Sequence, residues 1–297
     1  MADQRGKVKK MASDRTALVN SLLGKMDKQV EAAQRDLLRV VLNDFLDGME
    51  QDEAGNIKNT LANKRRFASF ETIFARFAKD RGLSVVQSIA EGTNKLVNFN
   101  HKYFSPFATK VTLAPIQENV KETLNAWLGI TTRGSVQPNG YLDALIKDAT
   151  IKNQIKNLTL KAVISQAGYF DTKKALETFI QGDSEKVGAL QKYYRNYAYD
   201  TFSVADRTAG KIYADKLRLN YAIYEGGIVE ASREFCRKRN GKVFSREEIA
   251  EFDPQEARQP GYDPFTDLGG YGCRHHLNWI PDAVAFALRP DLRSPAE

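Results

Sequence analysis

The sequence has few residues that can bind a metal or form a disulfide: two cysteines, Cys236 and Cys273, and three histidines among 297 residues. Two cysteines exclude the framework of several disulfides that stabilises small secreted domains. The two cysteines can still belong to a small reactive site or a metal-binding site. A chain of this length suits one large or two ordinary domains and can bury a hydrophobic core.

Long apolar runs are also absent. No run approaches the roughly 18 residues that cross a bilayer. The first ten residues, MADQRGKVKK, lack the apolar stretch of a signal peptide. We therefore expect no membrane contact and synthesis in a cytoplasm.

The excess of positive charge is small and diffuse. Lysine and arginine number 44 against 37 aspartates and glutamates, a net charge of +7. Residues 1–230 hold 34 basic and 26 acidic side chains, whereas residues 231–297 hold 10 and 11. This excess predicts at most a weak contact with DNA, unlike the dense basic clusters of a dedicated DNA-binding protein.

Proline divides the chain, because none of the nine prolines precedes Pro106 and six lie within residues 231–297. Proline interrupts both helices and strand ladders. We therefore predict a mainly α protein, in which an elongated helical N-terminal region precedes a small α+β module that contains the cysteines. The predicted regions are 1–110 (helical), 111–218 (helical, with one long helix) and 219–297 (α+β).

One helix is predicted from Ser13 to Gly48, because apolar residues recur there at steps of three and four. This stripe suits either a core face within the domain or a contact with a partner helix or neighbouring subunit. Further helices are predicted at 83–98, 116–128, 140–167, 172–181 and 184–217. The apolar positions of the first helix are Leu18, Leu22, Met26, Val30, Ala33, Leu37, Val41 and Phe45.

Four phenylalanines, Phe67, Phe70, Phe74 and Phe77, follow the basic cluster 64–66 at steps of three and four. Aromatic residues beside basic ones could stack on nucleic-acid bases. Aromatic residues at helical spacing are more often part of a hydrophobic core, and we predict a core role.

Beyond residue 220 the period changes to that of strands. Two β-favourable runs, 221–225 and 228–230, flank Gly226-Gly227 and predict a hairpin. Asn240-Gly241 predicts a turn before a short strand at 242–244. Ser245 and Glu248 have the spacing of a capping box that opens a helix.

Both cysteines and two of the histidines lie in this last module, at Cys236, Cys273, His275 and His276. If 271–276 is extended, Cys273 and His275 face one way and His276 the other. The predicted metal set is then Cys236, Cys273 and His275, a structural zinc site with one ligand missing. The fourth ligand could be His276 after a bend, water, or a carboxylate such as Asp263 or Asp267.

The same cluster is compatible with three further roles. The thiols and a histidine can simply pack the module, and a disulfide could form after release from a cell. A Cys/His pair can also act as a nucleophile, and His275, His276 and Asn278 resemble part of a metal-dependent nuclease.

Neighbouring glycines and arginines add no specific signal. None of the glycine pairs belongs to a phosphate-binding loop that ends in Gly-Lys-Ser/Thr. The basic residues at 233 and 237–239 could contact a polyanion, but nearby glutamates favour a solvated face of mixed charge.

Three ordered segments carry a family resemblance: YEGGIVEASREFC (224–236), RNGKVFSREEI (239–249) and LGGYGCRH (268–275). Together they resemble the C-terminal motif of tailed-phage minor head proteins, the Mu F-like head morphogenesis family. The aromatic stretch 194–200 and Asp206-Arg207 on the preceding helix are also similar to that family. The positions that match the motif are Ser232, Arg233, Phe235, Cys236, Gly241, Lys242, Gly269, Gly270, Cys273, Arg274 and His275.

The resemblance extends from about residue 120 to 280 and departs from the family at two places. Residues 253–264 replace a stretch that is often rich in tryptophan, and Glu234 stands where proline is frequent. These departures leave open the contacts that this loop makes in the family.

The resemblance implies a virion protein of the head or portal region, made in the host cytoplasm, that acts in head assembly, genome packaging or ejection. It implies portal or capsid proteins as partners and no catalytic mechanism, so we expect a protein that is not an enzyme. Self-association and weak contact with packaged DNA are further expectations. The alternative is a metal-dependent nuclease or toxin-like effector that uses the Cys/His cluster.

Overall fold

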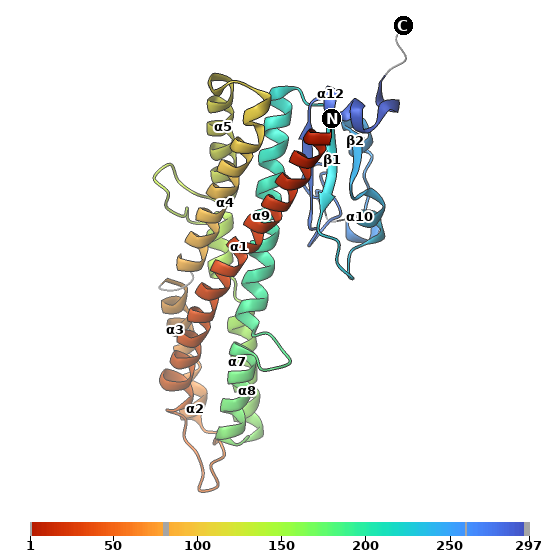
Figure 1. Cartoon of the computed structure of the whole chain (residues 1–297). Coiled ribbons are helices and arrows are strands. Elements are labelled where there is room, and N and C mark those ends of the chain that lie inside the picture. Colours follow the sequence, from red (N-terminus) through yellow and green to blue (C-terminus); the bar gives the residue numbers. More distant parts are fainter. Residues whose placement is uncertain (1, 80–82, 259, 294–297) are drawn as a thin grey trace. The chain divides into compact units, whose positions relative to one another are not determined.

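The computed structural model describes residues 2–79, 83–258 and 260–293 (Figure 1). It is mainly helical, with one small three-stranded antiparallel sheet near the C-terminus, which confirms the predicted fold class. No helix among the described residues is long and apolar enough to cross a membrane.

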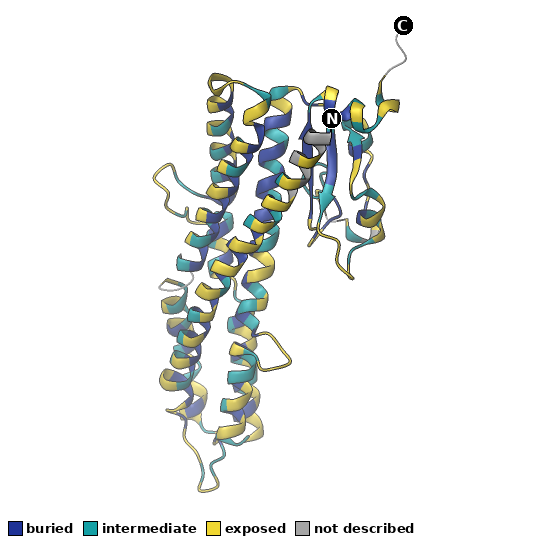
Figure 2. Ribbon diagram, viewed as in Figure 1, coloured by how far each residue is buried: buried dark blue, intermediate teal, exposed yellow. Residues whose placement is uncertain are grey.

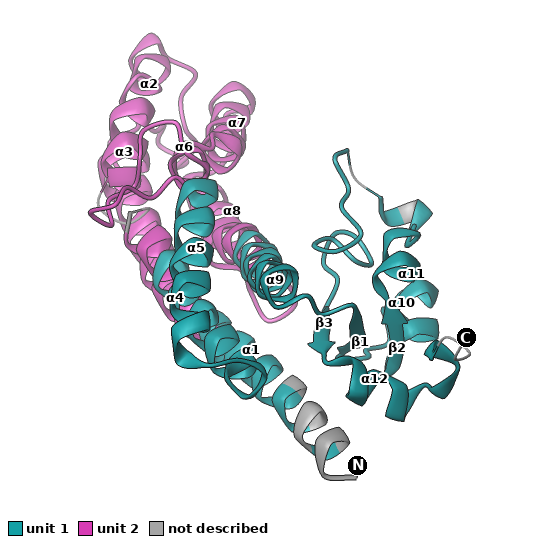
Figure 3. Ribbon diagram, turned by 90° about the horizontal axis from the view of Figure 1, so that it is seen from above, with its two compact units in different colours: residues 1–23, 89–128, 197–297 teal, residues 24–88, 129–196 magenta. Residues whose placement is uncertain are grey.

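The chain forms two compact units, each discontinuous in sequence (Figure 3). Unit 1 comprises residues 1–23, 89–128 and 197–297, and unit 2 comprises residues 24–88 and 129–196. Three helices, α1 (Ala2–Val40), α4 (Leu83–Phe104) and α9 (Ala189–Leu217), are long enough to contribute residues to both. Because of these shared helices, the bounds of the two units differ from those of the predicted regions 1–110, 111–218 and 219–297.

The helical part of unit 2 is built from the second half of the first predicted helix and several shorter helices. The apolar stripe continues from α1 into a π-helical turn, η1 (Val41–Leu46), and its members from Met26 to Phe45 are all buried. Helix α7 packs against α2, α3 and α8. The remaining helices are α2 (Leu61–Arg66), α3 (Ser69–Phe77), α6 (Tyr141–Lys147), α7 (Thr150–Ser165) and α8 (Tyr169–Gln181).

The predicted core role is confirmed for Phe70, whereas Phe67, Phe74 and Phe77 are half-buried. The Phe70 ring centroid lies 4.2 Å from that of Phe45 and 5.9 Å from that of Phe67. Phe74 stacks on Phe70 at 6.0 Å. The half-buried rings therefore pack around the one that lies in the core.

Unit 1 carries the sheet, whose strand order is β2-β1-β3. Strand β1 (Tyr221–Gly226) pairs antiparallel with β2 (Lys242–Ser245) and with β3 (His275–Ile280). All six residues of β3 are buried, as the dark colour of this strand in Figure 2 indicates. The other elements of unit 1 are α5 (Lys110–Leu128), α10 (Glu234–Arg239), α11 (Arg246–Ala250), α12 (Asp282–Leu288) and the short 3₁₀ helices η3 (Ser105–Phe107), η4 (Gln255–Ala257) and η5 (Pro290–Leu292).

The two faces of the sheet pack against different helices. One face presents residues such as Tyr224 and Trp279 to α4, α5 and α9, and the other presents Ile223 and Val243 to α12. The outer edge of β3 is also covered, since the Tyr103 hydroxyl donates to the Trp279 carbonyl at 2.8 Å. The sheet thus packs against helices on both faces, and Cys236 and Cys273 belong to the core on the face of Tyr224 and Trp279.

The predicted hairpin at Gly226-Gly227 is wrong. Residues 228–230 form a loop rather than a strand, because the hydrogen-bonding sides of β1 are taken by β2 and β3. Gly226 stays in β1, opposite His275, where an added Cβ would lie 2.6 Å from the His275 Cα. The exposed loop is held by Arg237, whose guanidinium donates to the carbonyls of Val229 and Glu230.

Local signals near the module are confirmed, and some helix bounds are not. Gly241 adopts a φ of +78° in the predicted turn, and Ser245 and Glu248 form the predicted capping box. The helix predicted at 140–167 is divided into α6 and α7 at Asp148, whose backbone leaves the helical region with a ψ of 124° and whose carboxylate accepts from the Thr150 N–H at 2.7 Å. Helix α9 begins at Ala189 rather than 184, after a turn that includes Gly182 at a φ of +84°.

Candidate metal centre

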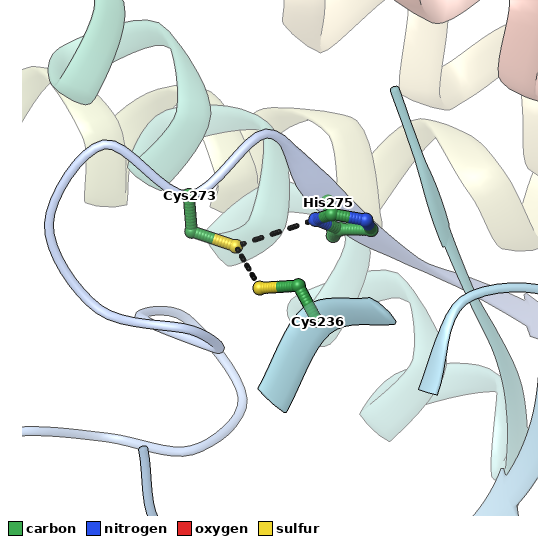
Figure 4. A group of neighbouring side chains, drawn as sticks. All are labelled: Cys236, Cys273 and His275. Atoms are coloured by element: carbon green, nitrogen blue, oxygen red, sulfur yellow. Dashed lines mark hydrogen bonds between the residues drawn. The ribbon is translucent and has the colours of Figure 1, made fainter. Parts of the chain in front are cut away.

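Three elements bring Cys236, Cys273 and His275 together inside unit 1 (Figure 4). Cys236 lies on α10, Cys273 on the loop before β3, and His275 begins β3. The Cys273 Sγ lies 3.8 Å from the Cys236 Sγ and 3.7 Å from the His275 Nδ1. All three donor atoms lie within 4.8 Å of one another, which is metal-binding distance.

The two separations from the Cys273 Sγ fit a tetrahedral zinc ion. With Zn–S bonds of about 2.3 Å and Zn–N bonds of about 2.0–2.1 Å, tetrahedral angles place two sulfurs about 3.8 Å apart and a sulfur and nitrogen about 3.5 Å apart. Two soft sulfur donors and an imidazole are also a typical zinc set. The three side chains are 3%, 3% and 1% exposed, so the cluster is closed to bulk solvent.

Gly269 makes this close approach possible. A Cβ at this position would lie 2.5 Å from the Cys236 Sγ and 3.1 Å from the Cys273 Sγ, closer than a carbon and a sulfur can pack. Gly270 and Gly272, with φ of +80° and +69°, supply the turns that return the chain to β3. The sequence LGGYGC therefore shapes the loop around the two sulfurs.

Two arginines hold this loop by its backbone. The buried Arg207 guanidinium, on α9, donates to the carbonyls of Thr266 at 3.0 Å and His275 at 2.9 Å and also to that of Cys273. Arg233 donates to the carbonyls of Gly269 at 3.1 Å and Tyr271 at 2.7 Å. The loop before β3 is thus anchored to α9 and to the start of α10.

The two thiols differ in their readiness to ionise. A hydrogen bond from the Cys236 thiol lowers the pKa of Cys273 well below its ordinary value, helped by the Arg207 charge and by His275, although burial raises it. The same hydrogen bond, together with burial, raises the pKa of Cys236. The pair therefore favours ionisation at Cys273 over Cys236, and a metal ion bound by both sulfurs would displace the proton of Cys236.

A tyrosine that the sequence did not single out completes the cluster. The Tyr224 hydroxyl, from β1, lies 3.3 Å from the Cys236 Sγ and 3.7 Å from the Cys273 Sγ. Its ring stacks on the His275 imidazole with centroids 4.9 Å apart and planes at 24°. Its position in a strand that pairs with β3 was not readable from sequence, since pairing partners are set by the tertiary fold.

None of the side chains suggested as the fourth ligand, His276, Asp263 and Asp267, joins the group of three. His276 points to the other face of β3, where its Nδ1 lies 2.7 Å from the Asp206 carboxylate. Asp263 and Asp267 bond within their own loop, the Asp267 carboxylate accepting from the Asp263 N–H at 2.7 Å. The predicted division of His275 and His276 between opposite faces is confirmed.

The opposite face of β3 carries a buried polar network. Arg15 of α1 lies 3.2 Å from the Asp206 carboxylate and also donates to Asn278. The amide of Asn100 donates to the same carboxylate at 2.7 Å. Although burial alone raises the pKa of Asp206, the charges of Arg15 and His276 lower it well below its ordinary value, so the carboxylate is ionised.

The other residues of the motif make structural contacts around the cluster. The Ser232 hydroxyl accepts from the Val229 N–H at 2.8 Å, and Phe235 contacts Tyr224 and carries the Arg239 guanidinium 3.8 Å above its ring. Lys242 begins β2. Arg274 lies over the Tyr199 ring at 5.9 Å.

The charged residues suggested as a polyanion contact are largely engaged within the module. Arg233 and Arg237 donate to backbone carbonyls, and Lys238 pairs with Glu234 at 3.3 Å. Cys273, the suggested nucleophile, is buried, and two residues of the suggested nuclease set, His276 and Asn278, contact Asp206 and Arg15. The chemistry this geometry offers best is therefore the binding of a metal ion.

Comparison of the chain with models of protein families, with curated proteins and with solved structures finds no match.

Proposed function

We propose that this chain is a structural protein of a bacteriophage virion, a minor head or portal-associated protein that acts through contacts with other proteins. The observation that carries the proposal is the convergence of the motif. Ser232–Cys236 and Gly269–His275 lie more than thirty residues apart, yet they meet at one buried cluster. Residues that match a phage head motif thus account for the core of a module, as expected if they preserve its fold.

The proposed partners are portal or capsid proteins and other copies of the chain. The helices bury their apolar faces against one another and so form a stable scaffold, whose surface can contact such partners. The net charge of +7 would permit weak, salt-sensitive contact with packaged DNA. The proposed role is binding, in head assembly, packaging or ejection, and not catalysis.

The test is to locate the protein in particles of the phage that encodes it. DNA-filled virions would be separated from lysate on a density gradient and probed with an antibody to the chain. They would be compared with particles made when the gene carries a stop codon, with the complemented mutant as the rescue control. We expect the chain in mature virions and few filled heads without it. Detection only in the soluble lysate would overturn the proposal.

We further infer that Cys236, Cys273 and His275 bind zinc, which stabilises the C-terminal module. The donor chemistry, the sulfur and nitrogen separations and the place of Gly269 support this assignment. Zinc would supply a cross-link between α10 and β3. Elemental analysis of the purified full chain should give about one zinc per chain, and Cys236→Ser should lose it.

A further inference from the structure

A zinc ion held by three protein ligands has a fourth position to fill. Structural zinc sites use four protein donors, whereas catalytic sites leave one position to water. The donors Cys236, Cys273 and His275 supply three. Which group takes the fourth position therefore decides whether the site is structural or reactive.

The Tyr224 hydroxyl lies where a fourth donor is required. With a Zn–O bond of about 2.0 Å and Zn–S bonds of about 2.3 Å, a tetrahedral oxygen lies about 3.5 Å from each sulfur. The Tyr224 Oη lies 3.3 Å from the Cys236 Sγ and 3.7 Å from the Cys273 Sγ. The phenol oxygen thus matches both required separations within about 0.2 Å.

The residues around the Tyr224 Oη hold it against the two sulfurs. A Cβ on Gly269 would lie 3.5 Å from the Tyr224 Oη as well as against both sulfurs, so the Gly269 backbone closes over the three atoms together. The Tyr224 ring is fixed by stacking on His275 and by contacts with Phe235 and Phe252. The side chain is therefore held in place before any metal binds.

Charge balance is compatible with phenolate coordination. Without a cation, the Tyr224 hydroxyl donates to the Cys236 Sγ. A bound divalent cation reverses this preference, because it favours ionised donors. Two thiolates and a phenolate would leave the zinc site with one negative charge, which lies in the field of the Arg207 and Arg233 guanidiniums.

We propose that the Tyr224 Oη is the fourth ligand and that it closes a Cys₂-His-Tyr metal site, an inference that rests on the proposed zinc site. When the metal binds, bonds form from it to both sulfurs, to the imidazole and to the phenol oxygen. The S–H bond of Cys236 and the O–H bond of Tyr224 break, and both protons pass to solvent. No electron is transferred, and no position remains for water.

The experiment compares the full-length wild-type chain with Tyr224→Phe and with the control Tyr262→Phe. Tyr262 is a half-buried tyrosine of the same module whose hydroxyl donates to the Leu268 carbonyl at 2.6 Å rather than to a sulfur. Each protein is stripped with chelator and titrated with Zn²⁺ while proton release and the tyrosinate absorbance are recorded. A second titration with Co²⁺ records the thiolate charge-transfer and d–d bands, before and after addition of imidazole.

For wild type and Tyr262→Phe we expect a tyrosinate signal that saturates at one metal per chain, tetrahedral Co²⁺ bands and no change with imidazole. Tyr224→Phe should release one proton fewer, show no tyrosinate signal, bind metal at least about tenfold more weakly and change its Co²⁺ spectrum when imidazole is added. Its thiolate bands should remain, which shows that the module is folded.

Two results would overturn the proposal, and they differ. If wild type shows the thiolate bands but no tyrosinate signal, and Tyr224→Phe has the same spectrum and proton release, the zinc site stands and the fourth ligand is not Tyr224. If wild type binds neither metal, the zinc site itself fails, and this inference fails with it.

Discussion

The Asp206 carboxylate lies 2.7 Å from the His276 Nδ1, and both side chains are almost completely buried. This contact joins α9 to the face of β3 opposite the candidate metal centre. Arg15 brings α1 to the same carboxylate at 3.2 Å. A single ionised aspartate thus connects three elements of unit 1 that are far apart in sequence.

Replacing this carboxylate should strongly destabilise unit 1. Asp206→Asn leaves the buried Arg15 guanidinium without its counter-charge, and removal of one partner of a buried ion pair costs about 3–5 kcal/mol. Chemical denaturation followed by circular dichroism measures the loss. The control is Asp14→Asn, which breaks an exposed pair with Lys10 and should cost less than about 1 kcal/mol; equal losses would contradict the role given to the network.

The same carboxylate predicts a pH dependence in acid. Its pKa is lowered in the folded chain, so the stability it contributes is present above its ordinary pKa of 3.8 and is lost as the pH falls below that value. With chelator present, the free energy of unfolding should fall more steeply below pH 4 in wild type than in Asp206→Asn. Parallel curves for the two proteins would show that Asp206 is not the group that titrates.

Adding one methyl group at Gly269 should disrupt the metal centre. The Cβ of Gly269→Ala would lie 2.5 Å from the Cys236 Sγ, so the sulfurs must separate. We expect at least about a tenfold loss of zinc affinity, measured by competition with a coloured chelator. Gly227→Ala is the matched control, because a Cβ there meets no atom within 4 Å; equal affinity in the two variants would count against the assigned geometry.

Arg207 should be irreplaceable by lysine. Its guanidinium serves the carbonyls of Thr266, Cys273 and His275, and a lysine ammonium cannot reach all of them in that planar arrangement. Arg207→Lys should therefore lose about 2–4 kcal/mol of stability through unpaired buried carbonyls and should also bind zinc more weakly.

The control for this variant is Arg237→Lys, since Arg237 is an exposed residue of α10 that also donates to backbone carbonyls, those of the 228–232 loop. Thermal unfolding of the two variants should separate clearly. A lysine at 207 that left both stability and zinc affinity unchanged would show that charge alone, and not the carbonyl contacts, is what the site requires.

The phenylalanine cluster of unit 2 gives a separate test of core against nucleic-acid contact. Phe70→Ala should cost about 3–5 kcal/mol, because Phe70 is fully buried against Phe45 and Phe67. Phe170→Ala, at a position 78% exposed, should cost less than about 0.5 kcal/mol.

The nucleic-acid reading is tested by the binding of a labelled single-stranded oligonucleotide, measured by fluorescence anisotropy. Binding should be the same for wild type and Phe170→Ala. A loss of binding that is specific to Phe74→Ala would support base stacking.

Local features of the chain were predictable because their physical causes are local. The apolar period of α1, the turn at Gly241 and the capping box of Ser245 and Glu248 each depend on residues a few positions apart. The alternation of side chains along a strand likewise placed His275 and His276 on opposite faces. Helix bounds were less accurate, as at Asp148, where the backbone leaves the helical region and ends α6.

The partners of β1 could not be predicted in this way. The sequence favoured a hairpin at Gly226-Gly227, whereas β1 pairs with β3, about fifty residues further along the chain. Strand pairing is decided by which arrangement buries the most apolar surface and satisfies the backbone, and this depends on the whole unit. The places of Tyr224 and Arg207 in the metal centre follow from that pairing, which is why the sequence did not assign them there.

By itself, the sequence determined that this protein is mainly helical with a small α+β module, and that two of its few histidines and both of its cysteines lie in that module. Only the tertiary structure decided that Cys236 meets Cys273 and His275 beneath Gly269, with Tyr224 beside them, and that His276 turns to Asp206 instead. The reason is physical: composition and period act over a few residues, whereas a buried site is formed by side chains that only the packing of distant elements brings within bonding distance.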